Sequence, residues 1–322
     1  MARTRDRDAA PPVTLVLANG FAGAGQRVTQ GGAALATVRS ADATVAVVAR
    51  PGSSLSVASN APKGNRPGTF TISMSTTRPK TARDATAYRD SGRTVIGDLV
   101  ALGMSRADAE REFGGMATMD GDAAVVSRQL ITFADAPLGA DADVARRAPS
   151  TTAVTPYDTQ CASINVAQGK ITGYGCSTFY LVHQDGDDWW LTTKMKVSAH
   201  SSDDSWFSPK RLTQLGWRAS WSAGNVLYDW DPYSTRPVGS CLTMTVKSSS
   251  PWADVSVQGT VCPDSLGPWT VTTARSGGIW NGMEQGTDYE GALATQAVHS
   301  QPGVALAYQS AWTLSYCDLW CN

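Results

Sequence analysis

The sequence predicts a mainly β protein, whose second half is an antiparallel β-sandwich with disulfides and whose first half is a smaller α+β N-terminal domain or pro-region. Three observations lead to this fold class. Apolar and polar residues alternate with a period of two along most apolar segments. Turn-forming Gly, Asp and Pro separate these segments at short intervals. All eleven tryptophans and all six cysteines follow residue 157.

The break in composition predicts the domain organisation. We expect one unit at residues 1–147, a polar linker at 148–156 and a second unit at 157–322, because the chain is long enough for two cores. The first unit has 18 basic and 14 acidic residues, and the remainder has 9 and 14. This charge is too weak and too scattered for a nucleic-acid surface, which needs clustered Lys and Arg. No apolar run approaches the roughly 18 residues of a membrane-spanning helix.

The first unit begins with short strands and continues with helices. Alternating runs predict strands at residues 13–17, 44–49, 55–57 and 70–74. Helical spacing of apolar residues predicts a helix over 82–102, ended by a glycine. Ser105 and Asp108 form a capping box for a second, short helix that we expect to end at Gly114 and Gly115. A further strand is predicted at 125–133.

Two places in the first half of the chain give evidence on export and proteolytic processing: its start and the tract that follows residue 145. The start of the chain is a poor signal peptide, because Asp6 and Asp8 interrupt its basic region and the apolar run at 13–18 is short. Four alternatives would reconcile this poor signal with export: an upstream start, a signal already removed, nonclassical export, or a degenerate signal at 10–24. The basic pair Arg146 and Arg147 beside a Ser/Thr/Pro tract suits proteolytic cleavage. Cleavage there would release a pro-region; the alternative is a retained second domain.

The second unit consists of predicted hairpins. Asp185 and Gly186 favour a tight turn between strands at 179–182 and 191–199. Alternation predicts a hairpin of residues 217–223 and 226–230, with aromatic residues on one side. It predicts a second hairpin in which 242–246 pair with 255–257. Alternation over 304–316 predicts a final strand with one packed face. Several short strands without a helical period indicate an antiparallel sandwich.

The cysteines predict three disulfides and an oxidising compartment. The local pairing needs the least rearrangement of the chain, since two pairs flank predicted hairpins and the third closes the tail. The expected bridges are Cys161 with Cys176, Cys241 with Cys262, and Cys317 with Cys321. Other connectivities, reduced thiols and a zinc site are the alternatives, although the chain has no CxxC motif and only three histidines.

The tryptophans have three interpretations. Most side chains of this kind pack in a core. The best functional alternative is stacking on sugars, with acidic side chains accepting hydrogen bonds from hydroxyl groups. The densest such cluster, and the expected ligand site, comprises Trp189, Trp190, Asp185, Asp187 and Asp188. The third interpretation is a membrane-interface belt, favoured by amphipathic hairpins such as 243–261.

Several chemistries lack their motifs. The sequence has no GxSxG, HExxH, GxxxxGK[ST] or trypsin-like GDSGG segment, and no GxGxxG that opens a helix after a strand. Acidic pairs such as Asp229 with Asp231 are read as solvated turn residues, because hydrolysis of a glycoside needs two carboxylates facing each other across a cleft. His183 and His200, each followed by aspartates, form a faint repeat that could hold Ca²⁺ or Zn²⁺. We expect no cofactor and no metal.

The cysteine-bounded hairpins, the Cys262–Pro263 step and the closing Trp-Thr-Leu-Ser-Tyr strand resemble uncharacterised secreted β-rich proteins of actinobacterial type. The resemblance covers residues 157–316. It implies export and a disulfide-stapled sandwich, and it transfers no catalytic residue. The favoured function is a secreted binding protein for glycans or a cell surface. A pore-forming, membrane-acting toxin with a removable pro-region is the alternative, and an extracellular hydrolase is the third.

Overall fold

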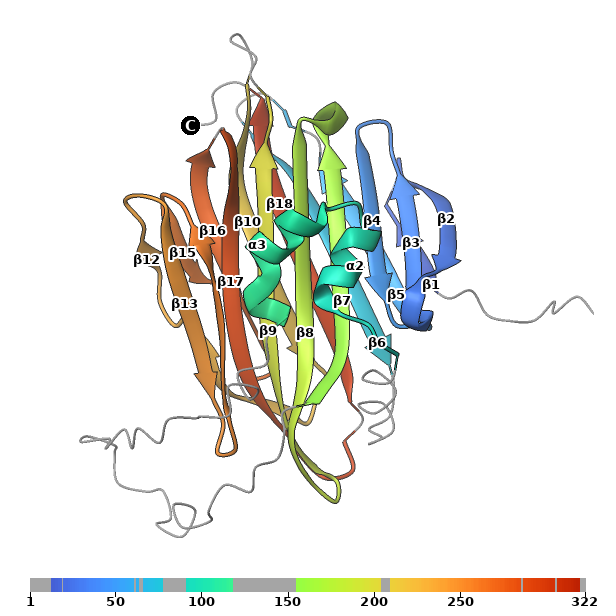
Figure 1. The fold of residues 1–322 in the computed structure, drawn as a ribbon, viewed down its shortest axis with the longest axis vertical. Coiled ribbons are helices and arrows are strands. Elements are labelled where there is room, and N and C mark those ends of the chain that lie inside the picture. Colours follow the sequence, from blue (N-terminus) through green and yellow to red (C-terminus); the bar gives the residue numbers. More distant parts are fainter. Residues whose placement is uncertain are drawn as a thin grey trace, which may run out of the picture.

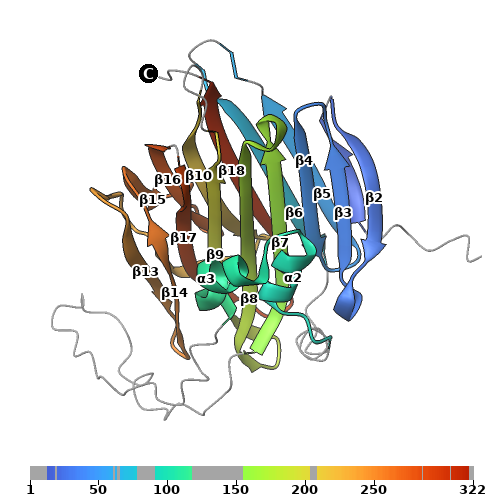
Figure 2. The same ribbon diagram turned by 45° about the horizontal axis from the view of Figure 1, so that its top comes forward.

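The computed structural model describes residues 13–77 apart from 19, 61, 64 and 65, residues 91–117, and residues 155–318 apart from 204–208, 285 and 305. It confirms the mainly β fold class. Two eight-stranded sheets lie face to face, and a separate two-stranded hairpin and two α-helices lie on one outer face of this sandwich (Figures 1 and 2). Among the described residues, neither helix is long and apolar enough to cross a membrane.

The first sheet, sheet A, is antiparallel except at its edge, where β1 runs parallel to β5. Its strands, in spatial order, are β1 (Val13–Leu17), β5 (Ser53–Asn60), β6 (Gly68–Thr77), β18 (Ala307–Asp318), β10 (Lys210–Trp221), β16 (Arg275–Glu284), β15 (Ser265–Pro268) and β12 (Arg236–Pro237).

The second sheet, sheet B, is antiparallel throughout and contains the longest strands. Its strands, in spatial order, are β11 (Asn225–Asp231), β17 (Gly286–Ser300), β9 (Asp188–Ser201), β8 (Ile171–Asp185), β7 (Thr155–Val166), β4 (Ala43–Ala49), β3 (Ala34–Arg39) and β2 (Ala22–Val28). Two short 3₁₀ turns, η1 (Gln30–Gly32) and η3 (Ala167–Gly169), join strands of this sheet.

The outer face of sheet B carries α2 (Val95–Ala101), α3 (Arg106–Ala117) and the hairpin of β13 (Leu242–Ser249) and β14 (Asp254–Val261). Figure 1 shows both helices lying in front of β7, β8 and β9. The predicted capping box is confirmed, because the Asp108 amide donates to Ser105 Oγ at 3.1 Å. The hairpin expected at 242–257 is also confirmed, with Val246 opposite Val257.

Most predicted strands of the first unit are present as β1, β4, β5 and β6, but β2 and β3 were not predicted. The sequence of β2, AGAGQRV, is almost fully exposed and has no apolar alternation. Of the helix expected over 82–102, residues 82–90 lie outside the described residues, residues 91–94 are not helical, and α2 begins at Val95. The strand expected at 125–133 also lies outside the described residues.

The second helix does not end at Gly114 and Gly115, as predicted, but continues through both glycines to Ala117. A Cβ atom at Gly115 would lie 3.4 Å from the Gln258 carbonyl oxygen of β14. The glycine therefore permits close packing of α3 against the hairpin, and tertiary contact outweighs its low helix propensity.

The division into two separately packed units is wrong. β4 pairs with β7, and β6 pairs with β18, so both sheets contain strands from both sides of residues 148–156. One continuous cluster of buried side chains joins Val45 and Ile72 of the first segment to Trp217 and Trp312 of the second. The expected linker also ends inside β7, which begins at Thr155. The described strands of residues 1–147 are thus part of both sheets, where they cover strand edges that would otherwise be exposed.

This pairing predicts the result of proteolysis between Arg146 and Arg147, residues that lie outside the described part of the chain. The two fragments should stay bound to each other, because they share both sheets and the core. Limited trypsin digestion followed by size-exclusion chromatography should give one native peak that separates into two only in denaturant. If residues 148–322, expressed alone, were monomeric with native tryptophan fluorescence, the shared core would be disproved.

Two of the three predicted disulfides are confirmed. Cys161 and Cys176 lie opposite each other on β7 and β8, and Cys241–Cys262 closes the base of the β13–β14 hairpin. Cys317 is buried at the end of β18, and Cys321 lies outside the described residues, so their pairing stays a prediction. Disulfides of this kind are typical of proteins that fold in an oxidising environment.

Glycines on β8 make room for the largest side chains of the core. Gly173 and Gly175 face sheet A, where Trp312 and Trp217 lie against them with ring centroids 5.8 Å apart. Trp217 also donates its indole N–H to Ser177. Glycine in a strand costs about 0.5–1 kcal/mol relative to alanine. Burial of two complete indole rings offsets that cost.

The hairpin predicted over 217–230 is not formed. β10 pairs with β16 and β18 in sheet A, whereas β11 pairs with β17 in sheet B. The turn at Gly224, which has a φ of 86°, carries the chain from one sheet to the other. Both runs form strands, as their alternation predicts, but alternation does not specify which neighbouring strand each of them pairs with. The packed face predicted for the final strand is confirmed in β18, where Tyr308, Trp312 and Leu314 are buried.

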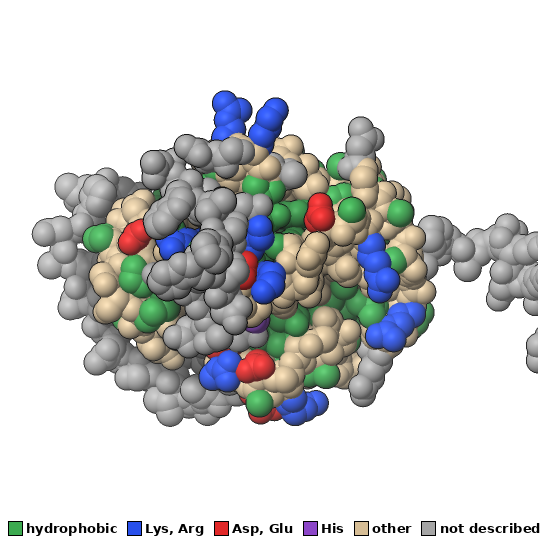
Figure 3. Space-filling view, turned by 90° about the horizontal axis from the view of Figure 1, so that it is seen from above, with side chains coloured by type: hydrophobic (Ala, Val, Ile, Leu, Met, Phe, Trp, Pro, Cys, Tyr) green, Lys and Arg blue, Asp and Glu red, His purple; other side chains and the backbone are tan. Residues whose placement is uncertain are grey.

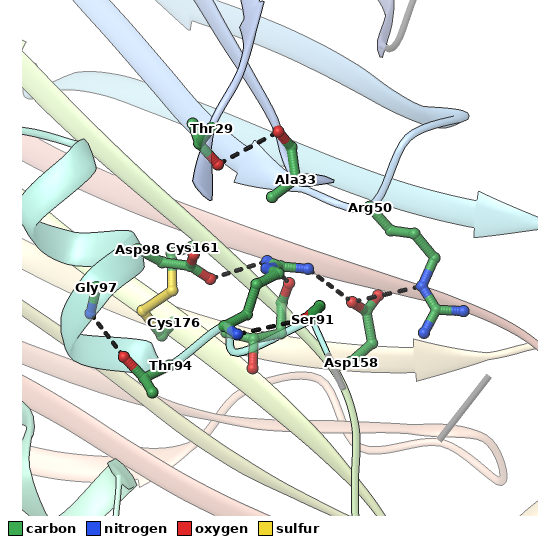
Figure 4. A network of polar contacts seen from close by, with 12 residues as sticks. Thr29, Ala33, Arg50, Ser91, Thr94, Gly97, Asp98, Asp158, Cys161 and Cys176 are labelled. Carbon is green, nitrogen blue, oxygen red and sulfur yellow. Dashed lines mark hydrogen bonds and ion pairs between the residues drawn. A yellow bond between two sulfur atoms is a disulfide. The ribbon is translucent and has the colours of Figure 1, made fainter. Parts of the chain in front are cut away.

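A buried ionic network ties the first segment to the second (Figure 4). Asp158 of β7 is fully buried and lies 3.3 Å from Arg93 Nη1 and 3.7 Å from Arg50 Nε. It also accepts a hydrogen bond from the Tyr308 hydroxyl. Arg93 binds Asp98 of α2 at 2.8 Å, and burial is the main cause that raises the pKa of the Asp98 carboxyl. Four separate parts of the chain thus meet at one carboxylate.

Candidate functional site

The two tryptophans of the expected ligand site point to opposite sides of sheet B. They are consecutive residues of β9, and successive side chains of a strand alternate between faces. Trp189 is 2% exposed and packs edge-on against Tyr157 in the core, with ring centroids 6.1 Å apart. Its expected ligand-binding role is therefore wrong, and it is a core residue. Trp190 is half-buried on the outer face.

Trp190 belongs to a row of ring side chains on the outer face of sheet B, near the turn between β8 and β9. His183 of β8 and His299 of β17 are its direct neighbours in the sheet register. Trp190 stacks on His299, with ring centroids 4.5 Å apart and planes 19° from parallel. Trp190 also packs edge-to-face with Tyr228 of β11, with ring centroids 5.1 Å apart. These residues lie on four strands of one face, where Trp190 contacts the rings of His299 and Tyr228 and is the register neighbour of His183.

Trp252, from the turn between β13 and β14, extends this row. Its indole stacks on the His183 ring at a centroid distance of 3.6 Å. We define the aromatic row as His183, Trp190, Tyr228, Trp252 and His299. Tyr228 is 56% exposed, and the other four are partly exposed, so the row is accessible along its length.

The three expected aspartates lie beside this row, in the tight turn between β8 and β9 that the sequence predicted. Asp185 and Asp188 pair across the turn, with Gly186 in the left-handed region between them. Asp185 and Asp187 are exposed. Asp188 Oδ1 lies 2.6 Å from His299 Nε2, which holds the imidazole against Trp190. The carboxylates thus stand beside the ring surface as hydrogen-bond acceptors.

The position of Tyr228 depends on an irregularity of β11. The register of β11 against β17 shifts between Leu227 and Asp229, as in a β-bulge. Such a bulge changes the direction of a side chain, and here Tyr228 contacts Trp190. Nothing in the sequence near Tyr228 indicated this. His183, in contrast, could have been found, because an Asp185–Asp188 turn pairs residue 183 with residue 190.

The acidic pair Asp229 and Asp231 binds the β13–β14 hairpin through hydrogen bonds. Asp229 accepts hydrogen bonds from Tyr233 and from the amide of Ser249, and Asp231 accepts one from the amide of Lys247 at 3.1 Å. These carboxylates thus bind backbone donors at the edge of β13. Tyr233 is 57% exposed, and partial desolvation together with its hydrogen bond to Asp229 raises the pKa of Tyr233 to about 12. The pair therefore has a structural function.

The faint repeat of histidine and aspartate does not form one metal centre within the described residues. His183 is stacked under Trp252, and Asp203 binds the Lys210 amide at 3.0 Å and Lys170 Nζ at 3.3 Å. In the described part of the chain, no three His, Cys, Asp or Glu side chains converge as metal ligands.

Two shallow hollows lie at the other end of the same face. One, of about 560 Å³, is lined by the 40–44 turn, η3, Tyr174 and Asn165, and the other, of about 430 Å³, lies beside β2 and β3. They meet at Leu102 and Gly103, which follow α2. Figure 3 looks onto this end of the sandwich, where basic and acidic side chains are scattered among polar and apolar ones. Neither hollow contains a stacked set of rings.

Between the hollows and the aromatic row, α3 covers a polar part of sheet B. Lys194 and Lys196 of β9 are 1% and 2% exposed. Lys196 Nζ donates to the Glu112 carbonyl, and Lys194 Nζ lies 3.5 Å from the Gly115 carbonyl. Both ammonium groups are therefore near the C-terminal end of α3, where cations are favoured by the helix dipole. The helix leaves the aromatic row uncovered.

Burial of Lys196 predicts a pH dependence of stability. Desolvation lowers the pKa of Lys196 from 10.5 to about 8 in the folded protein. Between these two values the unfolded chain binds more protons than the folded one, so the free energy of unfolding should rise with pH, by about 3 kcal/mol. Urea unfolding at pH 7 to 10.5 should show this rise relative to Lys196→Met, which lacks the group. Lys247→Met, at an exposed lysine, is the control and should parallel the wild type.

No known protein family matches the sequence, and no curated protein shows significant similarity to it.

Proposed function

We propose that the protein is a secreted binding protein that holds a glycan, as a free chain or as part of a cell surface, on the aromatic row. The observation that carries this proposal is the group of five partly exposed rings, four on sheet B and one in the β13–β14 turn, beside three aspartates. The confirmed disulfides support export, because they are typical of oxidising compartments.

The chemistry of the row suits a sugar. The C–H faces of a pyranose ring are apolar and pack on flat aromatic side chains, whereas its hydroxyl groups need hydrogen-bond partners. Trp190 and Trp252 supply flat surfaces, and the turn with Asp185 supplies acceptors. Because the rings are held by stacking and by the β-sheet register, little side-chain entropy is lost on binding.

Trp190→Ala should weaken glycan binding at least about tenfold, since truncation of a central aromatic contact removes a dominant part of the binding energy. Retention on immobilised polysaccharides or a glycan array measures this. Trp269→Ala is the matched control. Trp269 is also half-buried, but it directly follows β15 of sheet A, and the Arg218 guanidinium lies over its ring. If Trp190→Ala and Trp269→Ala bound glycans equally well, or lost binding to the same extent, a binding site at the aromatic row would be contradicted.

A membrane-acting toxin is the second candidate, favoured by the β13–β14 hairpin. The hairpin forms a sheet of its own, with Val246 and Val257 buried against the sandwich and Thr245 and Lys247 exposed. An amphipathic hairpin that is not part of the main sheets is the kind of element that can insert into a bilayer. Dye release from liposomes, abolished by a disulfide between the hairpin and β17, would favour this function over glycan binding.

A further inference from the structure

Two neighbouring arginines, Arg218 of β10 and Arg275 of β16, lie on the outer face of sheet A. Arg275 is opposite Ser220 in the sheet register, two residues along β10 from Arg218. The buried residues next to them in the chain, Trp217 and Ser276, point into the core, so both arginines point outward. Because α2, α3 and the β13–β14 hairpin lie on sheet B, this face is opposite the aromatic row.

Trp269 holds the Arg218 side chain against the sheet. Its ring lies on Gly216, where a Cβ atom would be 3.1 Å from the indole, and the Arg218 guanidinium is 4.6 Å from the ring centroid. Thr270, the next residue, has a φ of 49°, which is unusual for a β-branched residue. Strained backbone of this kind is concentrated at functional sites. The guanidinium is thus positioned before any ligand binds.

The described residues supply no counter-charge to the two arginines. Both side chains are half-buried, and neither guanidinium forms an ion pair with a described carboxylate. The Nε atom of each is buried without a hydrogen-bond partner among the described residues. Burial and the charge of Arg275 both lower the pKa of Arg218. An anion between the two guanidinium groups would offset their mutual repulsion.

The rest of sheet A has few charges, and none of them is close to the two arginines in the register. They lie on the edge strand β12 or at the far end of β10 and its neighbours, and they are Lys210, Arg211, Arg236, Glu284 and Asp318. The side chains opposite Arg218 are those of Gly277 and Ala311, which are too small to compete for its N–H groups. The donors are therefore open to a ligand.

We propose that Arg218 and Arg275 form a binding site for a sulfate or phosphate group, with the Ser220 hydroxyl as a further donor. A guanidinium group presents a planar fork of N–H donors that suits the oxygens of such groups. One fork can occupy both oxygens of a carboxylate, whereas sulfate and phosphate groups have three oxygens and can accept from two forks at once. The site is separate from the aromatic row and does not depend on the proposed glycan binding.

The test measures binding of the full-length protein to three polyanions by biolayer interferometry: heparin for sulfate, polyphosphate for phosphate and alginate for carboxylate. A salt concentration of about 0.15 M screens scattered surface charges. The protein should bind heparin, polyphosphate or both, and alginate at least about tenfold more weakly than the better of the two. The comparison of heparin with polyphosphate identifies which of the two groups is the ligand.

The double variant Arg218→Gln, Arg275→Gln should weaken this binding at least about tenfold, because it removes charge-assisted hydrogen bonds. Arg218→Lys should also weaken it, since lysine keeps the charge but lacks the fork. The charge-matched control is Lys63→Gln, Arg66→Gln, at an exposed basic pair between β5 and β6, and it should bind like the wild type. Without polyanion, the Gln variant should unfold at the wild-type temperature or above it, because the repulsion is gone.

Four results would overturn the proposal. They are absence of binding to all three polymers, alginate binding as tight as that of the other two, full binding by Arg218→Lys, and equal loss in the control variant, which would show only a general attraction between charges. Trp190→Ala should bind the polyanion normally, because Trp190 lies on the opposite face. Loss of binding in Trp190→Ala but not in the Arg variants would place the anion at the aromatic row instead.

Discussion

Asp158→Ala is expected to lower the free energy of unfolding by about 3–5 kcal/mol, which is the cost of removing one partner from a buried ion pair. Asp158 has no exposed surface, and Arg93, its nearest charged partner, has a side chain that is 4% exposed. Without the carboxylate, Arg93 loses one of its two buried counter-charges among the described residues, and the Tyr308 hydroxyl loses the Asp158 acceptor. The remaining charges cannot reach water without opening the junction of β7, α2 and β18.

The matched control is Asp254→Ala, which removes the same side chain from an exposed ion pair. Asp254 and Lys247 are 49% and 47% exposed, so this variant should lose at most about 1 kcal/mol. Urea unfolding followed by tryptophan fluorescence measures both variants. A loss for Asp158→Ala no larger than that of the control would show that the network does not join the two segments of the chain.

Gly175→Ala is expected to lower the free energy of unfolding by about 3 kcal/mol, because it overfills a packed core. A Cβ atom at residue 175 would lie inside the van der Waals radius of the Trp217 ring, and the backbone of β9 lies 3.3 Å away on the other side. The indole cannot withdraw, since Trp312 stacks on it and Ser177 accepts its N–H. Thermal or urea unfolding of the purified variant measures the loss.

A second substitution identifies the clash as the cause. Trp217→Leu alone should destabilise the protein by creating a cavity. In the Gly175→Ala background the same change should cost less, because the new methyl group occupies part of that cavity, and the two effects should be non-additive by 1 kcal/mol or more. Gly25→Ala is the control, since β2 offers open space around this strand glycine. Additive losses would contradict the predicted contact between residues 175 and 217.

Most of the hairpins could be predicted because their determinants are local. The Asp185–Gly186 turn, the alternation on both sides of it and the cysteines that flank 161–176 and 241–262 each act within about twenty residues. The two helices were also predicted, with a correct cap at Ser105. β2 was not predicted because an exposed edge strand needs no apolar pattern. α3 continues past Gly114 and Gly115 because β14 packs against Gly115.

The candidate site could be predicted only in part. The sequence identified Trp190 and the three turn aspartates, but it could not tell Trp190 from Trp189 until the buried face of β9 was known. His299 and Trp252 lie more than 60 residues from Trp190 in the chain. His299 reaches Trp190 because β17 pairs with β9, and Trp252 joins the row by stacking on His183, since the β13–β14 hairpin lies on the same face.

The fold class, the position of most strands and two disulfide-closed hairpins follow from side-chain period and turn chemistry within single segments of the sequence. The shared core of the two compositionally different parts, and the placement of β10 and β11 in different sheets, depend on contacts between distant segments. Alternation specifies that a strand has a buried face, but it does not specify which strand covers that face. Pairing across more than 100 residues, as between β6 and β18, depends on the fit of the whole core around side chains such as Trp217 and Trp312.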